Sequence, residues 1–402
     1  MVFFFGALVG YFLNKIFDFV LLKFQEIPFN NAKKKKKKFE QTMQDPKFIK
    51  FQTEVLMSFY GQDFFTYVFG NKYPVYCIGG NVNYPFKELC IEKFSKENNI
   101  QFQKNKYYKK YKKVIEANIK RPKMQGFMLD RFLLDVEGKI VGMKTWVGTY
   151  DENVYTSHIL EYELYEEYLK CKIKPETSCL KNLTLRNEIH NNLEIEEVLV
   201  SGCNRAALLG VQLLIVFKSK IDGRYQVLTI KRSEDVAAKP GFYQFVPSGG
   251  FEVFENSDEH SEHELRENYN ILWAIYREYM EELVLGKEND YEYGQGGETI
   301  AKIEKEKMIL QIKEYIENKT AHFEFLGSVV DLCGLRNELS FVLRIDDVSF
   351  GDLTFKSNNE SIKINRFFID EIQNSLDVEK INPSSAALWY LFTQNHLYKE
   401  II

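Results

Sequence analysis

Three glutamates close together in the sequence are the residues of this chain best suited to chemistry. Glu278, Glu281 and Glu282 stand at i, i+3 and i+4, so in a helix their carboxylates converge on one face. Carboxylates this close repel one another unless a positive charge lies between them, and oxygen-rich clusters of this kind suit Mg²⁺ or Mn²⁺. Gly249 and Gly250 precede them, and would let the backbone turn tightly and approach a ligand without a Cβ in the way.

A helix over residues 272–285 would position these carboxylates. Its apolar residues recur at steps of three and four and form one stripe, which is typical of a helix with a buried face. The stripe consists of Leu272, Ile275, Tyr276, Tyr279 and Leu283. The alternative explanation of the acidic residues is a glutamate-rich helix face exposed to solvent.

This stretch resembles the Nudix box of the Nudix hydrolases, a family that uses Mg²⁺ to cleave nucleoside diphosphates linked to another group. The resemblance covers Gly249, five further residues and Glu255, and then the run Arg277-Glu278-Tyr279-Met280-Glu281-Glu282. Two features depart from the family. Twenty-one residues separate Glu255 from Arg277 instead of seven, and Val284 stands where the family has glycine.

The resemblance implies a role for each residue of the box. Glu281 and Glu282 are expected to bind Mg²⁺, and Glu278 is expected to be a third ligand or the general base. Arg277 would orient these carboxylates by ion pairing. A metal-bound water would attack the bridging diphosphate, because Mg²⁺ lowers the pKa of that water and spreads the developing charge.

Residues beside the box are candidates for ligand binding through their position. Arg232 would meet a phosphate, Phe242 would stack on a base, and Glu252 would complete the metal site. Gly249 and Gly250 would bring the backbone against the ligand. Core or surface roles for these residues are the alternative.

The N-terminal residues 2–24 are dominated by Phe, Leu, Val and Ile, over about the length needed to cross a bilayer. Lys15 and Asp18 make insertion of an isolated helix marginal, so an amphipathic helix on the bilayer or on the protein body is the alternative. The apolar residues expected to face lipid include Val2, Phe3, Leu13, Phe17 and Leu22.

Six consecutive lysines, Lys33 to Lys38, follow this segment. Such a run should stay on the cytoplasmic side and touch anionic head groups, which predicts a protein of the inner cell membrane with most of its chain in the cytoplasm. A solvated linker is the alternative. The lysine-rich residues 101–123, with interleaved tyrosines, are interpreted as a charged helix face.

Length and composition predict an α/β protein in three parts. The chain has 402 residues, 45% apolar content and a net charge of −4, which is typical of a folded protein and not of one that binds a nucleic-acid polymer. The parts are a membrane segment with a basic linker over 1–40, an α/β domain over 41–200 and a Nudix α/β/α sandwich over 201–402. Strands are expected over 127–149 (a hairpin), 206–217, 225–230, 242–246, 322–332, 338–345 and 362–368, and helices over 154–168, 272–285 and 384–397.

This layout is similar to the transmembrane-Nudix effectors of CBASS antiphage defence. The resemblance implies that the Nudix domain senses a cyclic oligonucleotide, forms a homo-oligomer on activation and disturbs the lipid bilayer. A membrane-tethered, Mg²⁺-dependent hydrolase of nucleoside diphosphate derivatives is the alternative, and a nucleotide-binding regulator with no membrane role is a third.

Overall fold

The structure is a computed structural model that describes residues 34–80, 90–94, 106–115, 124–171, 179–233, 241–253, 262–285, 303–356 and 361–402. The expected membrane segment, with Val2, Phe3, Leu13, Phe17 and Leu22, lies outside these ranges, as does Glu255. No helix within them is both long and apolar enough to cross a bilayer.

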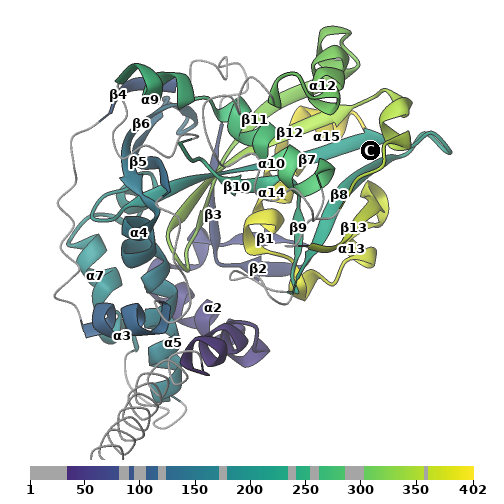
Figure 1. Cartoon of the computed structure of the whole chain (residues 1–402). Coiled ribbons are helices and arrows are strands. Elements are labelled where there is room, and N and C mark those ends of the chain that lie inside the picture. The colour runs from purple at the N-terminus through teal and green to yellow at the C-terminus, as the bar shows by residue number, and fades with distance from the viewer. Residues whose placement is uncertain are drawn as a thin grey trace, which may run out of the picture.

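An 11-stranded mixed sheet forms the centre of the molecule (Figure 1). Its axis is β7 (Ala207–Lys218), which is buried along most of its length, as is typical of a strand covered on both faces. β12 (Arg336–Ile345) runs parallel to β7. β11 (Ala321–Asp331) is antiparallel to β12, and β3 (Val75–Gly79) is antiparallel to β11.

Three strands share the other edge of β7. β8 (Tyr225–Arg232), β10 (Ser248–Gly250) and β5 (Gln125–Leu134) pair antiparallel with successive segments of it. The remaining strands extend from these: β6 (Ile140–Thr149) and β4 (Cys90–Phe94) beyond β5, and β9 (Tyr243–Phe245) and β13 (Ser361–Phe368) on β8. Strands from both sides of residue 200 therefore belong to one sheet, while β1 (Thr66–Val68) and β2 (Asn71–Tyr73) form a separate pair.

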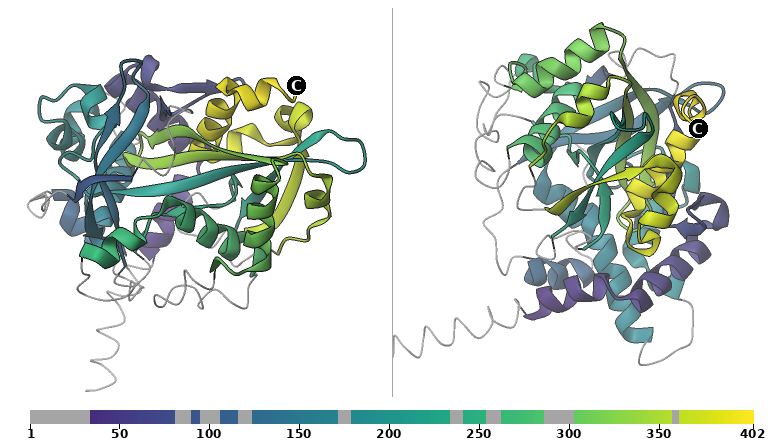
Figure 2. Two further views of the ribbon diagram at one scale, coloured as in Figure 1. Left: turned by 90° about the horizontal axis from the view of Figure 1, so that it is seen from above. Right: turned by 90° about the vertical axis from the view of Figure 1, so that its right-hand side faces the viewer.

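Helices cover both faces of the sheet (Figure 2). On one face α10 (Ile271–Tyr279) and α12 (Lys307–Glu317) share a core with Leu213 and Ile215 of β7. On the other face α14 (Pro383–Gln394) packs against Leu214 and Val216. The alternation of inward and outward side chains along β7 thus gives each helix layer its own core, in the helix–sheet–helix order predicted for residues 201–402.

The remaining helices gather at one end of the sheet (Figure 1). Residues 34–43 are helical. The others are α2 (Pro46–Tyr60), α3 (Lys106–Ile115), α4 (Tyr150–Asn153) with its continuations Val154–His158 and α5 (Ile159–Cys171), α6 (Cys179–Asn182), α7 (Thr184–His190) and α8 (Ile195–Leu199). α9 (Glu262–Asn268) precedes α10, and shorter turns are Gln62–Phe64, Val348–Asp352, Ile369–Glu371, Ile372–Ser375 and Val378–Lys380.

A buried arginine joins this helical end to the sheet. Arg186 is fully buried and donates hydrogen bonds to Tyr60 Oη at 2.8 Å and to the carbonyls of Leu332 and Cys333 at 2.6 and 2.7 Å. The two carbonyls belong to the turn between β11 and β12. Glu163 of α5 accepts the backbone N–H of Arg186 at 3.3 Å. Arg186 therefore fixes α7 against α2, α5 and the β11–β12 turn.

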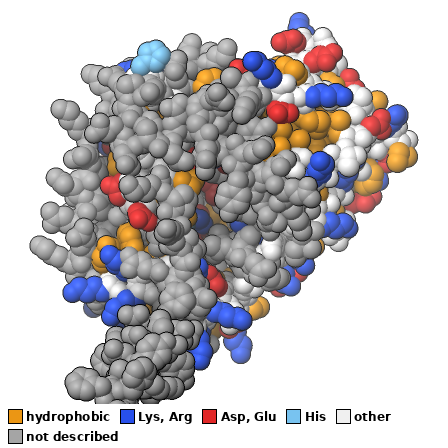
Figure 3. Space-filling model, in the orientation of Figure 1, with side chains coloured by type: hydrophobic (Ala, Val, Ile, Leu, Met, Phe, Trp, Pro, Cys, Tyr) orange, Lys and Arg blue, Asp and Glu red, His pale blue; other side chains and the backbone are white. Residues whose placement is uncertain are grey.

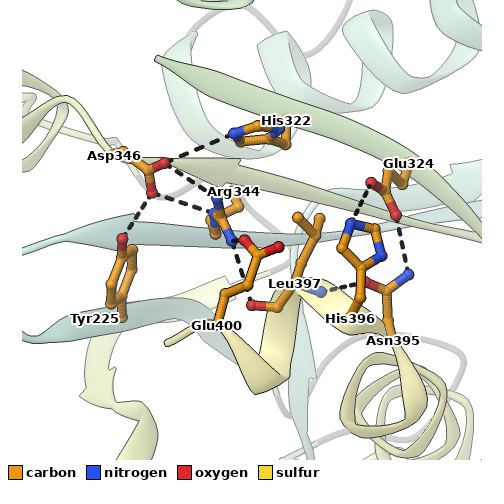
Figure 4. Close-up of polar contacts among 9 residues, drawn as sticks. All are labelled: Tyr225, His322, Glu324, Arg344, Asp346, Asn395, His396, Leu397 and Glu400. Atoms are coloured by element: carbon orange, nitrogen blue, oxygen red, sulfur yellow. Dashed lines mark hydrogen bonds and ion pairs between the residues drawn. The ribbon is translucent and has the colours of Figure 1, made fainter. Parts of the chain in front are cut away.

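The C-terminal residues are held by a second, more exposed arginine. Arg344 of β12 contacts Asp346 and donates to Glu400 Oε2 at 2.5 Å, just past α15 (His396–Lys399) (Figure 4). Tyr225 Oη donates to Asp346 Oδ1 at 2.7 Å. These bonds fasten the last turn of the chain to the ends of β8 and β12.

The predicted elements agree with the structure in type and approximate position. The hairpin over 127–149 is formed by β5 and β6, and its turn contains Gly138, whose φ of 75° lies in the region that favours glycine. The helix predicted over 384–397 is interrupted. Asn395 ends α14 and accepts the N–H of Leu397 with its side chain at 2.7 Å, so that it caps α15 instead.

Candidate functional site

The helix that carries the acidic residues begins at a side-chain cap. Asn270 Oδ1 accepts the N–H groups of Leu272 and Trp273 at 3.1 and 3.3 Å, which satisfies two donors of the first turn. From Ile271 the helix runs as α10 and continues as a π-helical segment, Met280–Val284. Four members of the predicted stripe, Ile275, Tyr276, Tyr279 and Leu283, are buried and Leu272 is half-buried. The helix and its buried face are confirmed.

Arg277 supplies the positive charge that the crowded carboxylates require. Its side chain is only 8% exposed. Nη1 lies 3.0 Å from Glu252 Oε2, Nη2 lies 2.5 Å from Glu278 Oε1, and Nε lies 3.8 Å from Glu281 Oε1. Nη2 also donates to the carbonyl of Gly250 at 2.9 Å. We call these four side chains the Arg277 cluster.

The Arg277 cluster is electrostatically strong. Burial alone would lower the pKa of Arg277, but the carboxylates of Glu252, Glu278 and Glu281 raise it above the ordinary value. The guanidinium therefore stays charged at any pH at which the protein is folded. Its orienting role, implied by the family resemblance, agrees with these contacts.

The two glycines of the box make room for the protein's own carboxylates. A Cβ on Gly249 would lie 2.0 Å from Glu278 Cδ, and a Cβ on Gly250 would lie 2.6 Å from Glu252 Oε1. The sequence suggested that this space admits a ligand. In the structure the carboxylates of Glu278 and Glu252 occupy it, and both are held there by hydrogen bonds from Arg277.

Glu252 owes its position to the N-terminal half of the chain. Phe127 N donates to the carbonyl of Phe251 at 3.0 Å, and Val253 N donates to the carbonyl of Gln125 at 2.9 Å. These bonds extend β5 along the residues on either side of Glu252. The site is thus built on strands that come from both sides of residue 200.

Glu282 contacts the other end of β10. It is 4% exposed, and its Oε2 accepts the backbone N–H of Ser248 at 2.9 Å. Ser248 Oγ in turn accepts from Gln244 Nε2 at 2.9 Å, and Gln244 Oε1 accepts from Arg232 Nη1 at 2.7 Å. A chain of hydrogen bonds therefore links the predicted phosphate-binding residue to the predicted metal ligand. Gln244 and Ser248 were not predicted, because no local pattern marks them.

The donor set fits a divalent cation that brings ligands of its own. Arg277 contacts the carboxylates of Glu252, Glu278 and Glu281, and the carboxylate of Glu282 is held at Ser248 on the short strand β10, so the four carboxylates and one guanidinium carry a formal charge of −3. Within the described ranges no three His, Cys, Asp or Glu side chains come together closely enough to hold a metal ion by themselves. Mg²⁺ commonly takes only one or two carboxylates and completes its coordination with water and substrate phosphates. The donors therefore suit a cation that arrives with a phosphorylated ligand, and the three-carboxylate site expected from the sequence stays a prediction.

Two predicted ligand-binding residues lie in different environments. Arg232 is half-buried at the end of β8 and is held by Gln244. Phe242 is 6% exposed, so a base would reach its ring only after a rearrangement. Its stacking role stays a prediction.

Comparisons with known proteins yield structural similarity only. No family model matches the sequence, and no curated protein matches it. The chain is similar to a Nudix hydrolase from M. smegmatis, RenU, at 12% identity and a TM-score of 0.26, over 48% of this chain and 88% of that one.

Two further solved structures are similar at the same level. One is the Nudix domain of Shewanella oneidensis NrtR complexed with ADP ribose, at 12% identity, a TM-score of 0.27 and 48% and 90% coverage of this chain and that one. The other is a bifunctional NMN adenylyltransferase/ADP ribose pyrophosphatase from Francisella tularensis complexed with AMP and Mn ion. It has 12% sequence identity and a TM-score of 0.28, over 58% of this chain and 53% of that one. At TM-scores of 0.26 to 0.28, these similarities do not identify the family of this chain.

Proposed function

We propose that residues 201–402 form a Nudix-type domain that binds a nucleoside diphosphate derivative and hydrolyses its diphosphate linkage with the help of Mg²⁺. The Arg277 cluster, together with Glu282, carries this proposal. The order Arg-Glu-x-x-Glu-Glu is combined with contacts that hold Glu278 and Glu282 against the same three-residue strand, β10.

Each residue of the site has a task under this proposal. Glu278 and Glu282 would hold Mg²⁺, which when bound neutralises phosphate charge and activates water. Arg277 positions Glu278 and Glu281, so that the carboxylates are ordered before a ligand arrives. Arg232 would contact a phosphate, with Gln244 fixing the direction of its guanidinium.

A second function, sensing without cleavage, is favoured by one observation. Arg277 engages three of the four carboxylates, which leaves fewer oxygens for a catalytic cation. In that case the domain would bind a cyclic oligonucleotide and act as the sensor of a membrane effector in CBASS-type defence, with assembly as the response. The ligand would bind the assembled state more tightly than the unassembled one, and this difference in affinity would shift the equilibrium towards assembly.

One experiment separates the two functions. The full chain is incubated with Mg²⁺ and a panel of nucleoside diphosphate derivatives and cyclic oligonucleotides, and both bound ligand and released product are measured. We expect hydrolysis that falls by about 10²-fold in Glu282→Gln, the range found when a metal site loses a supporting group. Glu317→Gln, which changes an exposed glutamate of α12, should keep the full rate.

Three outcomes are informative. Equal rates for Glu282→Gln and Glu317→Gln would refute the hydrolytic role of the site. Tight binding of a cyclic oligonucleotide with no product from any compound would support the sensor. Neither binding nor turnover across the panel would remove both functions.

A further inference from the structure

Lys34 to Lys38 of the lysine run are part of a folded helix and not of a loose linker. Residues 34–43 are helical, and Phe39 makes edge-to-face contacts with Tyr111, Tyr162 and Tyr165 at centroid distances of 6.5, 5.5 and 5.1 Å. Met43, one turn further, is buried in the main core. Because this face of the helix is fixed, lysines on its other faces are held at the surface.

A second basic helix lies beside the first. α3 contributes Tyr111 to the contact with Phe39, and buries Tyr107, Tyr111 and Val114. Its opposite side bears Lys109, Lys110 and Lys113, which are exposed. The two helices are some seventy residues apart in the sequence, yet both views place them together at one end of the molecule (Figures 1 and 2).

Together these helices form one basic surface. Its exposed lysines are Lys34, Lys35, Lys37, Lys38, Lys109, Lys110 and Lys113. Lys110 forms an ion pair with Glu166 at 2.7 Å. Lys and Arg side chains gather at this lower end in the space-filling view (Figure 3). We call it the two-helix basic face.

We propose that the two-helix basic face docks on the anionic head groups of a lipid bilayer. Two observations favour lipid as the partner. Nine residues separate the face from the segment 2–24, which is mostly Phe, Leu, Val and Ile, so the chain would pass from an apolar phase to an anionic surface within a short distance. Of the three tyrosines of α3, Tyr107 and Tyr111 are buried in the core, and the half-buried Tyr108 packs against Tyr155, so the helix offers few stacking platforms to nucleic-acid bases.

Such docking would fix the orientation of the folded protein relative to the bilayer. A basic run on a flexible tether attracts head groups but leaves the body free to turn. Lysines on two helices fixed to one core instead present one end of the sheet to the bilayer, and put α12 at the far end (Figure 1). This inference is independent of the proposed nucleotide chemistry, since no residue of the Arg277 cluster belongs to the face.

Changes on α3 test the face without altering the lysine run or the apolar segment. The full chain, Lys109→Gln/Lys113→Gln and the matched control Lys305→Gln/Lys307→Gln are compared. The control removes the same charge from exposed positions at the α12 end. Binding is measured by sedimentation with vesicles of phosphatidylcholine and phosphatidylserine, with vesicles of phosphatidylcholine alone, and with an RNA duplex. Thermal unfolding checks that every variant is folded.

The α3 variant should bind the anionic vesicles about 30-fold more weakly than the wild type, at about 1 kcal/mol for each lysine. The α12 variant should stay within about twofold, and added salt should weaken wild-type binding. Equal losses in both variants, or no loss in the α3 variant, would overturn the proposal, because binding would then come from net charge or from the N-terminal residues alone. Stronger binding to RNA than to anionic vesicles would overturn it in favour of a nucleic-acid partner.

Discussion

Two buried arginine sites in this chain differ in what surrounds the guanidinium. Arg277 meets three carboxylates and one carbonyl. Arg186 meets a tyrosine hydroxyl and two carbonyls, and nearby Arg205, also fully buried, donates to the carbonyls of Ser201 and Leu335. Both guanidiniums donate to several buried acceptors, but only the first has an excess of negative charge around it.

The difference separates a site that can recruit a ligand from one that completes a fold. Around Arg186 and Arg205 the acceptors are neutral, and burial lowers the pKa of Arg205. Around Arg277 the surplus negative charge is held next to the surface, since Glu281 is 35% exposed. A cation that arrives with a phosphate would reduce the repulsion among these carboxylates.

Replacement of the arginines by methionine should give the largest effects and tests the comparison directly. Arg186→Met leaves the buried carbonyls of Leu332 and Cys333 without their donor and removes the electrostatic attraction between Arg186 and Glu163, so the free energy of unfolding should fall by about 3–5 kcal/mol. Arg277→Met should cost less, about 1–3 kcal/mol, because the carboxylates of Glu252 and Glu281 are 16% and 35% exposed and can be hydrated. Urea denaturation of both variants measures the two free energies of unfolding. Equal losses would contradict the distinction between a ligand-recruiting arginine site and a structural one.

The glycine of the box offers a second contrast. Gly249→Ala puts a Cβ 2.0 Å from Glu278 Cδ, so the carboxylate must move, at about 1–3 kcal/mol and with loss of nucleotide binding. Gly79→Ala is the matched control, because a Cβ there comes no nearer than 3.9 Å to Lys139 Cγ. Thermal unfolding and ligand binding of the two variants should diverge. Unchanged binding in Gly249→Ala would show that the position of Glu278 does not matter.

The pH dependence of stability should reveal two opposed groups near Arg186. Burial raises the pKa of Glu163 from 4.5 to about 7, so its contribution is present below pH 4.5 and is lost as the pH rises to about 7. Burial, reinforced by Arg186 and Arg205, lowers the pKa of His190 from 6.5 to about 4. Its contribution is present above pH 6.5 and is lost as the pH falls towards 4.

The two slopes oppose each other between about pH 4.5 and 6.5. Denaturant titrations should therefore find wild-type stability nearly flat there. In Glu163→Gln stability should rise with pH across the window, and in His190→Phe it should fall. Parallel curves for all three proteins would mean that neither group titrates differently in the folded state.

The smallest effect is expected at the C-terminus. The hydrogen bond from Arg344 lowers the pKa of Glu400, so this contact stabilises the folded state above the ordinary carboxyl range and is lost as the pH falls through the lowered value. Glu400→Gln should speed amide hydrogen exchange in α15 and leave β12 unchanged, because an exposed ion pair contributes little globally. Faster exchange throughout the sheet would contradict this local role.

The elements of this fold were predictable where one local pattern decides them. The stripe of α10 and the glycine turn of the β5–β6 hairpin each depend on neighbouring residues alone. Partners across the sequence were not predictable. No pattern around Glu252 announces that β5 will hold it, and none around Glu282 points to the N–H of Ser248.

The helical state of the lysine run was unpredictable for a related reason. Its helix is stabilised by Phe39, whose partners Tyr111, Tyr162 and Tyr165 lie on α3 and α5. A single aromatic residue after six lysines carries no periodic signal. Only the tertiary contact makes it an anchor.

The sheet shared across residue 200 has a practical consequence for anyone who wishes to isolate the half that contains the box. A fragment starting at residue 201 would lack β3 and β5. The edge of β11 and the N-terminal end of β7 would then have unpaired backbone groups that other chains could bind. Such a fragment should aggregate during expression, and Glu252 would lose the backbone ladder beside it.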